Sequence, residues 1–121
     1  MYDIVCIAVL QHPESQNVLV GSNATFLCGI RFNYSSISWK ELSPGANELT
    51  PLSQDEGNGI YIHEIQISED EGYNSTLTIV ITYSNAERWN GTILWCSAES
   101  GGPPLISERA TLAIHKSLSK T

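Results

Sequence analysis

The sequence predicts an all-β protein in which two antiparallel sheets pack face to face as a sandwich. Residues that favour turns recur at short intervals, and the runs between them are rich in Ile, Val, Thr, Tyr and Trp. Several of these runs alternate apolar and polar residues with a period of two, which is typical of strands with one buried face. No run of helical length has an apolar period of 3.6 residues. These observations favour a sandwich over a helical or mixed fold.

The turn signals divide the chain into eight expected strands. Turn-forming clusters such as residues 11–15, 43–47 and 101–104 separate them. Residues 60–67 alternate poorly, and a β-bulge is one explanation for this. The pattern also allows a short additional strand near residues 47–51. The eight strands are expected near residues 4–10, 16–20, 23–30, 36–42, 60–67, 75–82, 91–98 and 105–115.

Alternation assigns the buried face of four of these strands, because every second residue of a strand points to the same side. On the strand at 91–98 it leaves Ile93, Trp95 and Ser97 on the outer face. The residues expected to face inward are Phe26, Cys28, Ile30, Ile37, Trp39, Leu77, Ile79, Ile81, Leu94, Cys96 and Ala98.

Length and charge limit the possible classes of protein. The 121 residues are expected to form one domain, residues 1–115, followed by a polar linker or tail at 116–121. Thirteen acidic and six basic residues give a net charge of −7, and the basic residues do not cluster. No nucleic-acid partner is therefore expected, since phosphate neutralisation needs clustered cations. No apolar run reaches the roughly 18 residues of a membrane span, so any membrane anchor is expected to lie outside this chain.

Four Asn-x-Ser/Thr sequons, at Asn23, Asn33, Asn74 and Asn90, point to the secretory pathway. With 8 Asn and 23 Ser plus Thr in 121 residues, chance predicts roughly 1.5 sequons. The excess favours an extracellular domain that carries glycans, in a compartment that also permits disulfides. Accidental sequons in turns rich in Ser and Asn are the alternative.

Cys6, Cys28 and Cys96 are the three cysteines, and their spacing does not indicate a zinc site. An odd number leaves one thiol over if the other two pair. Cys6 has three interpretations: a packed free thiol on the first strand, a bridge to another chain or an adjacent domain, or a competitor for one of the other cysteines.

Four residues are expected on separate short strands: Cys28, Trp39, Leu77 and Cys96. This arrangement resembles that of the immunoglobulin superfamily. The resemblance covers residues 7–115, and the separation of 68 residues between Cys28 and Cys96 is similar to variable-like or intermediate-set domains of cell-surface receptors and adhesion molecules. It implies an immunoglobulin-like antiparallel β-sandwich with one inter-sheet disulfide, Cys28–Cys96, and with Trp39 and Leu77 in the core. In the chain-entropy model, a disulfide that closes a loop of this length stabilises the folded state by about 4 kcal/mol.

Two departures from the family pattern bear on the kind of domain. Leu94 stands where the family usually has a Tyr, so the tyrosine corner is missing and the turn at residues 83–89 must be held differently. The last strand also lacks the Gly-x-Gly bulge of antigen-receptor variable domains. Both point away from an antigen receptor and toward a divergent adhesion or recognition receptor.

The resemblance also implies a binding surface, the outer face of the sheet that contains the strands at 36–42, 91–98 and 105–115. The outward residues expected there are Ser38, Lys40, Ile93 and Trp95. An outward Trp beside an Ile is unusual on a monomer surface, and large aromatic residues are enriched at interface hot spots. Alternatively, Trp95 packs over a cross-strand neighbour or is covered by a glycan.

The expected glycans favour this sheet face over the loops at its end. A glycan on Asn33 would shield the loops at one end of the sandwich. The glycan that could cover Trp95 is the one expected on Asn90. Sugars on Asn23 and Asn74 are expected on or near the opposite sheet, where they would leave the binding face free.

No motif in the sequence indicates catalysis, a metal or a cofactor. The three His residues are scattered, and neither a nucleophile motif nor a phosphate-binding loop occurs. We therefore expect no enzyme and no cofactor. The acidic run at 68–72 lacks the ligand spacing of a calcium loop and is expected to be a solvated turn.

The expected function is extracellular protein–protein recognition, as cell adhesion or receptor–ligand binding by a cell-surface glycoprotein. The partner would be another cell-surface or secreted protein, or a second copy of this chain. A soluble secreted immune-modulatory binding protein is one alternative. An intracellular structural immunoglobulin module is another, and it would carry no glycans.

Overall fold

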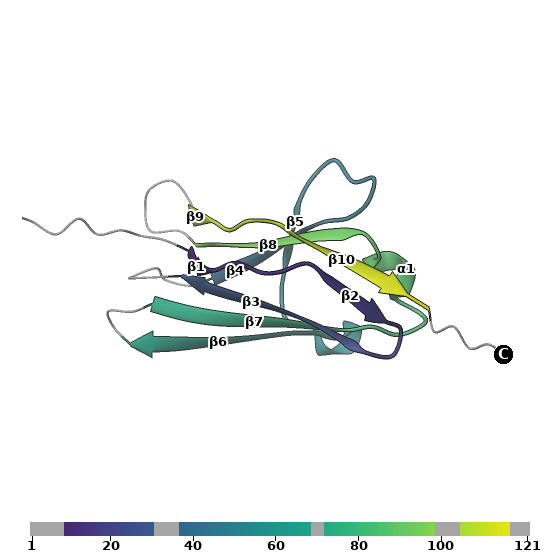
Figure 1. The fold of residues 1–121 in the computed structure, drawn as a ribbon, viewed down its shortest axis with the longest axis horizontal. Coiled ribbons are helices and arrows are strands. Elements are labelled where there is room, and N and C mark those ends of the chain that lie inside the picture. The colour runs from purple at the N-terminus through teal and green to yellow at the C-terminus, as the bar shows by residue number, and fades with distance from the viewer. Residues whose placement is uncertain (1–8, 31–36, 69–71, 99–104, 117–121) are drawn as a thin grey trace, which may run out of the picture.

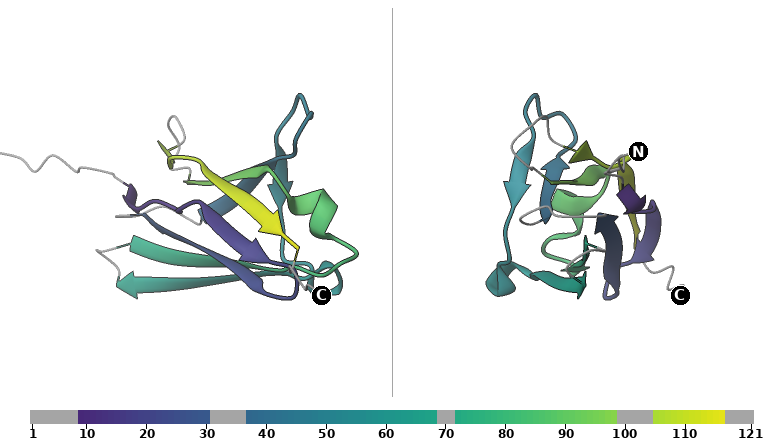
Figure 2. Two further views of the ribbon diagram at one scale, coloured as in Figure 1. Left: turned by 45° about the vertical axis from the view of Figure 1, so that its right-hand side comes forward. Right: turned by 90° about the vertical axis from the view of Figure 1, so that its left-hand side faces the viewer.

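The computed structural model describes residues 9–30, 37–68, 72–98 and 105–116, which form two β-sheets packed face to face (Figure 1 and Figure 2). The β3/β7 sheet has the order β1-β3-β7-β6, and the β4/β8 sheet has the order β2-β10-β8-β4-β5, with β9 also paired to β8. All pairs are antiparallel except β2 and β10. The strands are β1 (Val9–Gln11), β2 (Gln16–Leu19), β3 (Asn23–Ile30), β4 (Ile37–Leu42), β5 (Thr50–Leu52), β6 (Ile60–Ser68), β7 (Gly72–Val80), β8 (Thr92–Ala98), β9 (Leu105–Ile106) and β10 (Ala110–His115).

This arrangement confirms the all-β antiparallel sandwich, while several boundaries differ from those expected. Strand β7 begins three residues earlier and ends two residues earlier than the range expected from the sequence. The last expected strand is divided into β9 and β10, and a short α-helix, α1 (Ala86–Trp89), was not expected. The irregular alternation after residue 60 coincides with a register shift between Gln66 and Ser68 in β6. A 3₁₀-helix, η1 (Glu56–Asn58), precedes this strand.

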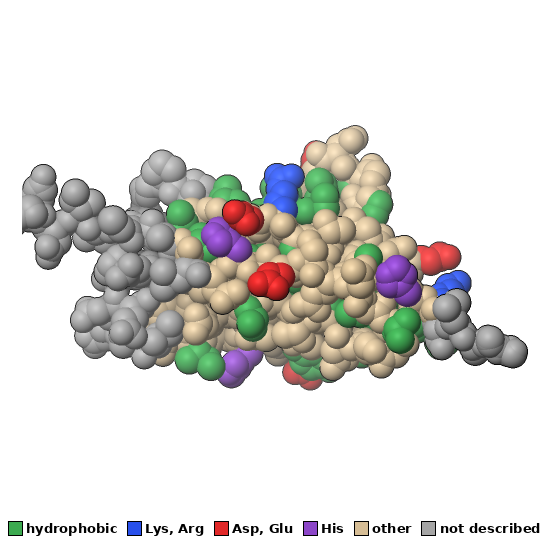
Figure 3. Space-filling model, viewed as in Figure 1, with side chains coloured by type: hydrophobic (Ala, Val, Ile, Leu, Met, Phe, Trp, Pro, Cys, Tyr) green, Lys and Arg blue, Asp and Glu red, His purple; other side chains and the backbone are tan. Residues whose placement is uncertain are grey.

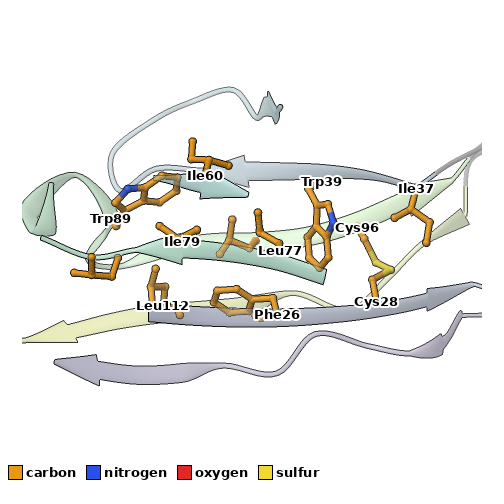
Figure 4. Close-up of a cluster of buried hydrophobic side chains, with 14 of the residues drawn as sticks. Phe26, Cys28, Ile37, Trp39, Ile60, Leu77, Ile79, Trp89, Cys96 and Leu112 are labelled. Carbon is orange, nitrogen blue, oxygen red and sulfur yellow. A yellow bond between two sulfur atoms is a disulfide. The ribbon is translucent and has the colours of Figure 1, made fainter. Parts of the chain in front are cut away.

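The core lies between the two sheets and is crossed by the Cys28–Cys96 disulfide, which joins β3 to β8. Trp39 lies beside the disulfide, and Leu77 lies next to Trp39 (Figure 4). Both side chains are fully buried, as expected. The indole Nε1 of Trp39 donates a 2.9 Å hydrogen bond to Oγ of Ser75, a buried residue of β7. This bond satisfies a donor that would otherwise be costly to bury.

The chain crosses from one sheet to the other between β1 and β2. Strand β1 pairs with β3, whereas β2 pairs with β10. Between them, Nδ1 of His12 accepts a hydrogen bond from the Glu108 backbone N–H, and Oγ of Ser15 accepts one from the Thr111 N–H. Side chains of the crossing segment therefore accept hydrogen bonds from backbone N–H groups just before and within β10, where the strand pairing is interrupted.

The turn before β8 is held by side chains of α1 instead of a tyrosine corner. Trp89 is buried in the core, and Oδ1 of Asn85 accepts a hydrogen bond from the Thr82 backbone N–H. Arg88 forms an ion pair with Glu41, an inward-facing residue of β4. The turn is thus fastened to the β4/β8 sheet by residues that the family pattern does not specify.

Candidate functional site

The outer face of the β4/β8 sheet brings together the four residues expected to bind a partner. Lys40 lies directly opposite Trp95, and Ser38 lies opposite Ser97. Ile93 lies opposite Leu42 in the next row of the same face. Because successive side chains of a strand point to opposite faces, the register places all of these residues on one face of β4 and β8.

Trp95 is on this face but is buried there, which agrees with the alternative that it packs over a neighbour on the sheet. Only 3% of its surface is accessible. The guanidinium carbon of Arg109 lies 4.6 Å from the centroid of the Trp95 ring, which is the geometry of a cation–π contact. Trp95 therefore packs against neighbours on the sheet, and the cation above it faces the solvent.

The break between β9 and β10 positions Arg109 above the ring. Ser107, within the break, is buried, and its Oγ accepts a 3.0 Å hydrogen bond from the Cys96 backbone N–H. Its own N–H donates to the Cys96 carbonyl at 2.9 Å. These two bonds anchor the break next to β8, two residues before Arg109. No sequence pattern predicts this break, because the usual glycine bulge is absent and a single Ser makes the contact.

Two of the six basic side chains of the chain, Lys40 and Arg109, flank Trp95. The other basic residues in the described part of the chain are Arg88 and Lys116, and Figure 3 shows the Lys and Arg side chains of one face well separated from each other. In a chain of net charge −7, this produces a local patch of opposite sign. Partly buried Ile93 and Leu42 and the 54% exposed Ile106 surround it. We call Lys40, Ile93, Trp95, Ile106 and Arg109 the cation–aromatic patch.

Two of the sequons lie on the other sheet. Asn23 begins β3 and Asn74 is in the first half of β7, and both are exposed. Asn90 follows α1, is exposed, and its Oδ1 accepts a hydrogen bond from the Ile114 backbone N–H at 2.8 Å. That bond leaves the amide nitrogen available for a sugar. Asn33 and Cys6 lie outside the described residues, and so do the remaining residues of 31–36 and 99–104, which the sequence predicts to be loops.

A pocket of about 580 Å³ lies at the end of the sandwich near η1 and α1. Its lining includes Asp55, Tyr61, Asn85 and Arg88. The Arg88 guanidinium in this lining is already paired with Glu41. Across the described ranges, no three His, Cys, Asp or Glu residues are grouped as a metal site. Within those ranges, no helix is long and apolar enough to span a membrane.

Comparison with solved structures identifies the architecture. A chain in the structure described as the basis of T cell specificity and activation by the bacterial superantigen toxic shock syndrome toxin-1 matches with a TM-score of 0.66 and 18% identity, covering 90% of this chain and 99% of that one. The N-terminal Ig1-2 module of the Drosophila receptor protein tyrosine phosphatase DLAR matches with a TM-score of 0.65 and 22% identity, over 95% of this chain and 52% of that one. The chain has the immunoglobulin fold.

A third similar structure, the BTLA ectodomain, gives a TM-score of 0.63 and 12% identity, over 90% of this chain and 98% of that one. No protein-family model matches the sequence. A search of curated proteins likewise found no match. The resemblance of Cys28, Trp39, Leu77 and Cys96 to an immunoglobulin domain is therefore confirmed at the level of the fold, and the ligand is not given by any of these comparisons.

Proposed function

We propose that this immunoglobulin domain is an extracellular recognition module that binds another protein through the cation–aromatic patch. The similar BTLA and DLAR structures are a receptor ectodomain and a receptor module, which supports an extracellular role. The sequons on exposed Asn residues of β3 and β7 support the same compartment. Glycans at these positions would leave the β4/β8 sheet free for a partner.

The observation that carries the proposal is the contact between Arg109 and Trp95. The ring beneath the guanidinium restricts its position before any partner binds, which lowers the entropy cost of using it in an interface. Lys40 lies opposite the same ring. Two cations on one sheet face, with apolar side chains beside them, suit a protein surface that carries carboxylates. A stable contact would bury about 800 Å² on each partner.

The charge of the patch favours a partner different from the chain itself. Pairing of two copies about a two-fold axis that passes through the patch itself would bring Lys40 and Arg109 of one copy near the same residues of the other. Like charges placed together across an interface are costly. We therefore propose an acidic protein surface as the partner, presented by another cell-surface protein or by a secreted one.

The test is binding of the multimerised, mammalian-secreted domain to a panel of cell-surface and secreted ectodomains. We expect the Lys40→Glu/Arg109→Glu variant to lose the interaction that the original protein shows, and the original interaction to weaken as salt is added. The variant Lys116→Glu is the matched control, since it changes one exposed cation outside the patch. Equal binding by the double variant would exclude this face.

Sedimentation velocity over a concentration series tests the choice of partner. We expect the secreted domain to remain monomeric with and without reductant. A reversible dimer that the Lys40→Glu/Arg109→Glu variant abolishes would show self-recognition through the patch and overturn the proposed acidic partner. A dimer lost only with reductant would implicate Cys6.

A further inference from the structure

The outer face of the β3/β7 sheet carries apolar side chains that no residue in the described part of the chain covers fully. Leu27 on β3 is 48% exposed and Ile65 on β6 is 52% exposed. Both point away from the core, because the residues on either side of Leu27 are buried and Ile65 pairs with exposed Asn74. Exposed apolar side chains gathered on one sheet face are a liability unless something covers them.

Asn74 lies in the middle of this face. In the sheet register it stands between Gly29 on β3 and Ile65 on β6. A Cβ atom placed on Gly29 would come within 2.8 Å of Oδ1 of Asn74. The glycine therefore leaves room for the Asn74 side chain to lie over β3. Asn74 is also the first residue of an Asn-Ser-Thr sequon and is exposed.

The distances within the sheet place the apolar residues within reach of one sugar on Asn74. Directly opposed residues of neighbouring antiparallel strands have Cβ atoms about 5 Å apart, and diagonal neighbours lie about 7–8 Å apart. Ile65 is the direct neighbour of Asn74, and Leu27, which pairs with Thr76, is the diagonal one. An N-acetylglucosamine ring has an apolar face and an acetamido methyl group that can remove such side chains from water.

We propose that Asn74 carries an N-linked glycan whose first sugar lies on the β3/β7 sheet and covers Leu27 and Ile65. The proposal rests on the extracellular location in the proposed function. In the attachment step, Nδ2 of Asn74 forms a bond to the anomeric carbon of a lipid-linked oligosaccharide. The bond from that carbon to the lipid diphosphate breaks, and the amide loses a proton. The glycan closes this sheet to partners.

Asn23 provides an internal comparison for this role. It lies on the same face at the other end of β3 and pairs with Val80. Leu27 is four residues further along the strand, about 13 Å away at the rise of an extended chain. A glycan on Asn23 therefore increases solubility but leaves Leu27 and Ile65 uncovered by its first sugar.

The experiment uses the domain secreted from mammalian cells with the Asn74 sequon alone, as the Asn23→Gln/Ser35→Ala/Asn90→Asp variant. Glycopeptide mass spectrometry measures the occupancy of Asn74. One sample is trimmed by an endoglycosidase to a single N-acetylglucosamine, and a second is fully deglycosylated while folded. We expect the trimmed form to match the intact one. The bare form is expected to bind more of the apolar dye ANS and to melt about 3 °C lower.

Variants of the sequon and of the apolar pair provide matched controls. Thr76→Val removes the sequon and should reproduce the bare form, whereas Thr76→Ser retains it and should behave as the original. In a Leu27→Thr/Ile65→Thr background, removal of the sugar should no longer change dye binding. A variant with Asn23 as its one sequon should show no difference between its trimmed and bare forms.

Two results would overturn the proposal. An unoccupied Asn74 beside an occupied Asn23 in the secreted original protein would exclude the modification. An occupied Asn74 whose trimmed and bare forms have the same dye binding and melting temperature would exclude the covering role. Neither measurement depends on a binding partner. A failure of the cation–aromatic patch in binding assays is therefore distinguishable from a failure of the glycan proposal. Sugar at none of Asn23, Asn74 and Asn90 would count against both proposals.

Discussion

Arg88 and Glu41 form a bidentate ion pair that connects α1 to β4. The guanidinium donates from Nη1 to Oε1 at 2.8 Å and from Nη2 to Oε2 at 2.7 Å. The side chain of Glu41 is 4% exposed and that of Arg88 is 46% exposed. The same guanidinium lies 3.6 Å from the centroid of the buried Trp89 ring. The pair therefore closes the turn before β8, where the tyrosine corner of the immunoglobulin fold is missing.

Arg88→Ala is expected to destabilise the domain by about 1–3 kcal/mol, because it leaves a buried carboxylate without its partner. The exposure of the guanidinium keeps the loss below that of a fully buried pair. Urea unfolding with the disulfide intact measures the change. The double variant Arg88→Ala/Glu41→Gln should lose less than the sum of the two single losses. An Arg88→Ala variant no less stable than the exposed-charge control Lys116→Ala would contradict this role for the pair.

The residues of the sandwich that could be predicted are those fixed by local alternation. Phe26, Cys28, Leu77 and Cys96 alternate with polar or outward residues on strands bounded by turn signals, and the structure buries all of them. A period of two is a property of a few neighbouring residues, so it can be read without knowledge of the partners. The same pattern correctly placed Lys40 and Trp95 on one face.

The features that could not be predicted depend on pairings between distant parts of the chain. Helix α1 has four residues, too few to show a helical period, and is held by Glu41, which is 47 residues away from Arg88. The break beside Ser107 places Arg109 over the ring of Trp95, which lies on another strand. Neither contact affects the local alternation of apolar and polar residues. That alternation shows on which face of the strand a residue lies, but not which distant residues cover it.

Ser75→Ala is expected to cost about 1–3 kcal/mol of stability, because it leaves the buried indole N–H of Trp39 without an acceptor. The change keeps the Asn74 sequon, since any residue except Pro is allowed at its middle position. Thermal unfolding compared with Ser53→Ala, an exposed position, measures the loss. In near-UV circular dichroism, the tryptophan signal of Ser75→Ala should change while that of Ser53→Ala should not. Equal stability of the two variants would show that the bond contributes nothing.

Removal of the Cys28–Cys96 disulfide is expected to destabilise the domain by about 4 kcal/mol. The bridge closes a loop of 68 residues, so its loss frees much of the unfolded chain. The Cys28→Val/Cys96→Val variant, which keeps apolar side chains in the core, is compared with the oxidised original by urea unfolding. A midpoint unchanged within error would mean that core packing alone holds the sheets together.

Trp95→Ala is expected to lower stability by about 3–5 kcal/mol, as for a large aromatic side chain removed from a buried site. Arg109→Ala removes only the cation above the ring and should cost about 0.5–1 kcal/mol. It should also shift the fluorescence maximum to longer wavelength, since water then reaches Trp95. A loss of binding in Trp95→Ala could therefore arise from unfolding as well as from loss of the patch. Arg109→Ala keeps the sandwich folded, so a loss of binding in that variant measures the contribution of the patch alone. Equal stability of Trp95→Ala and the original protein would contradict the burial on which this distinction depends.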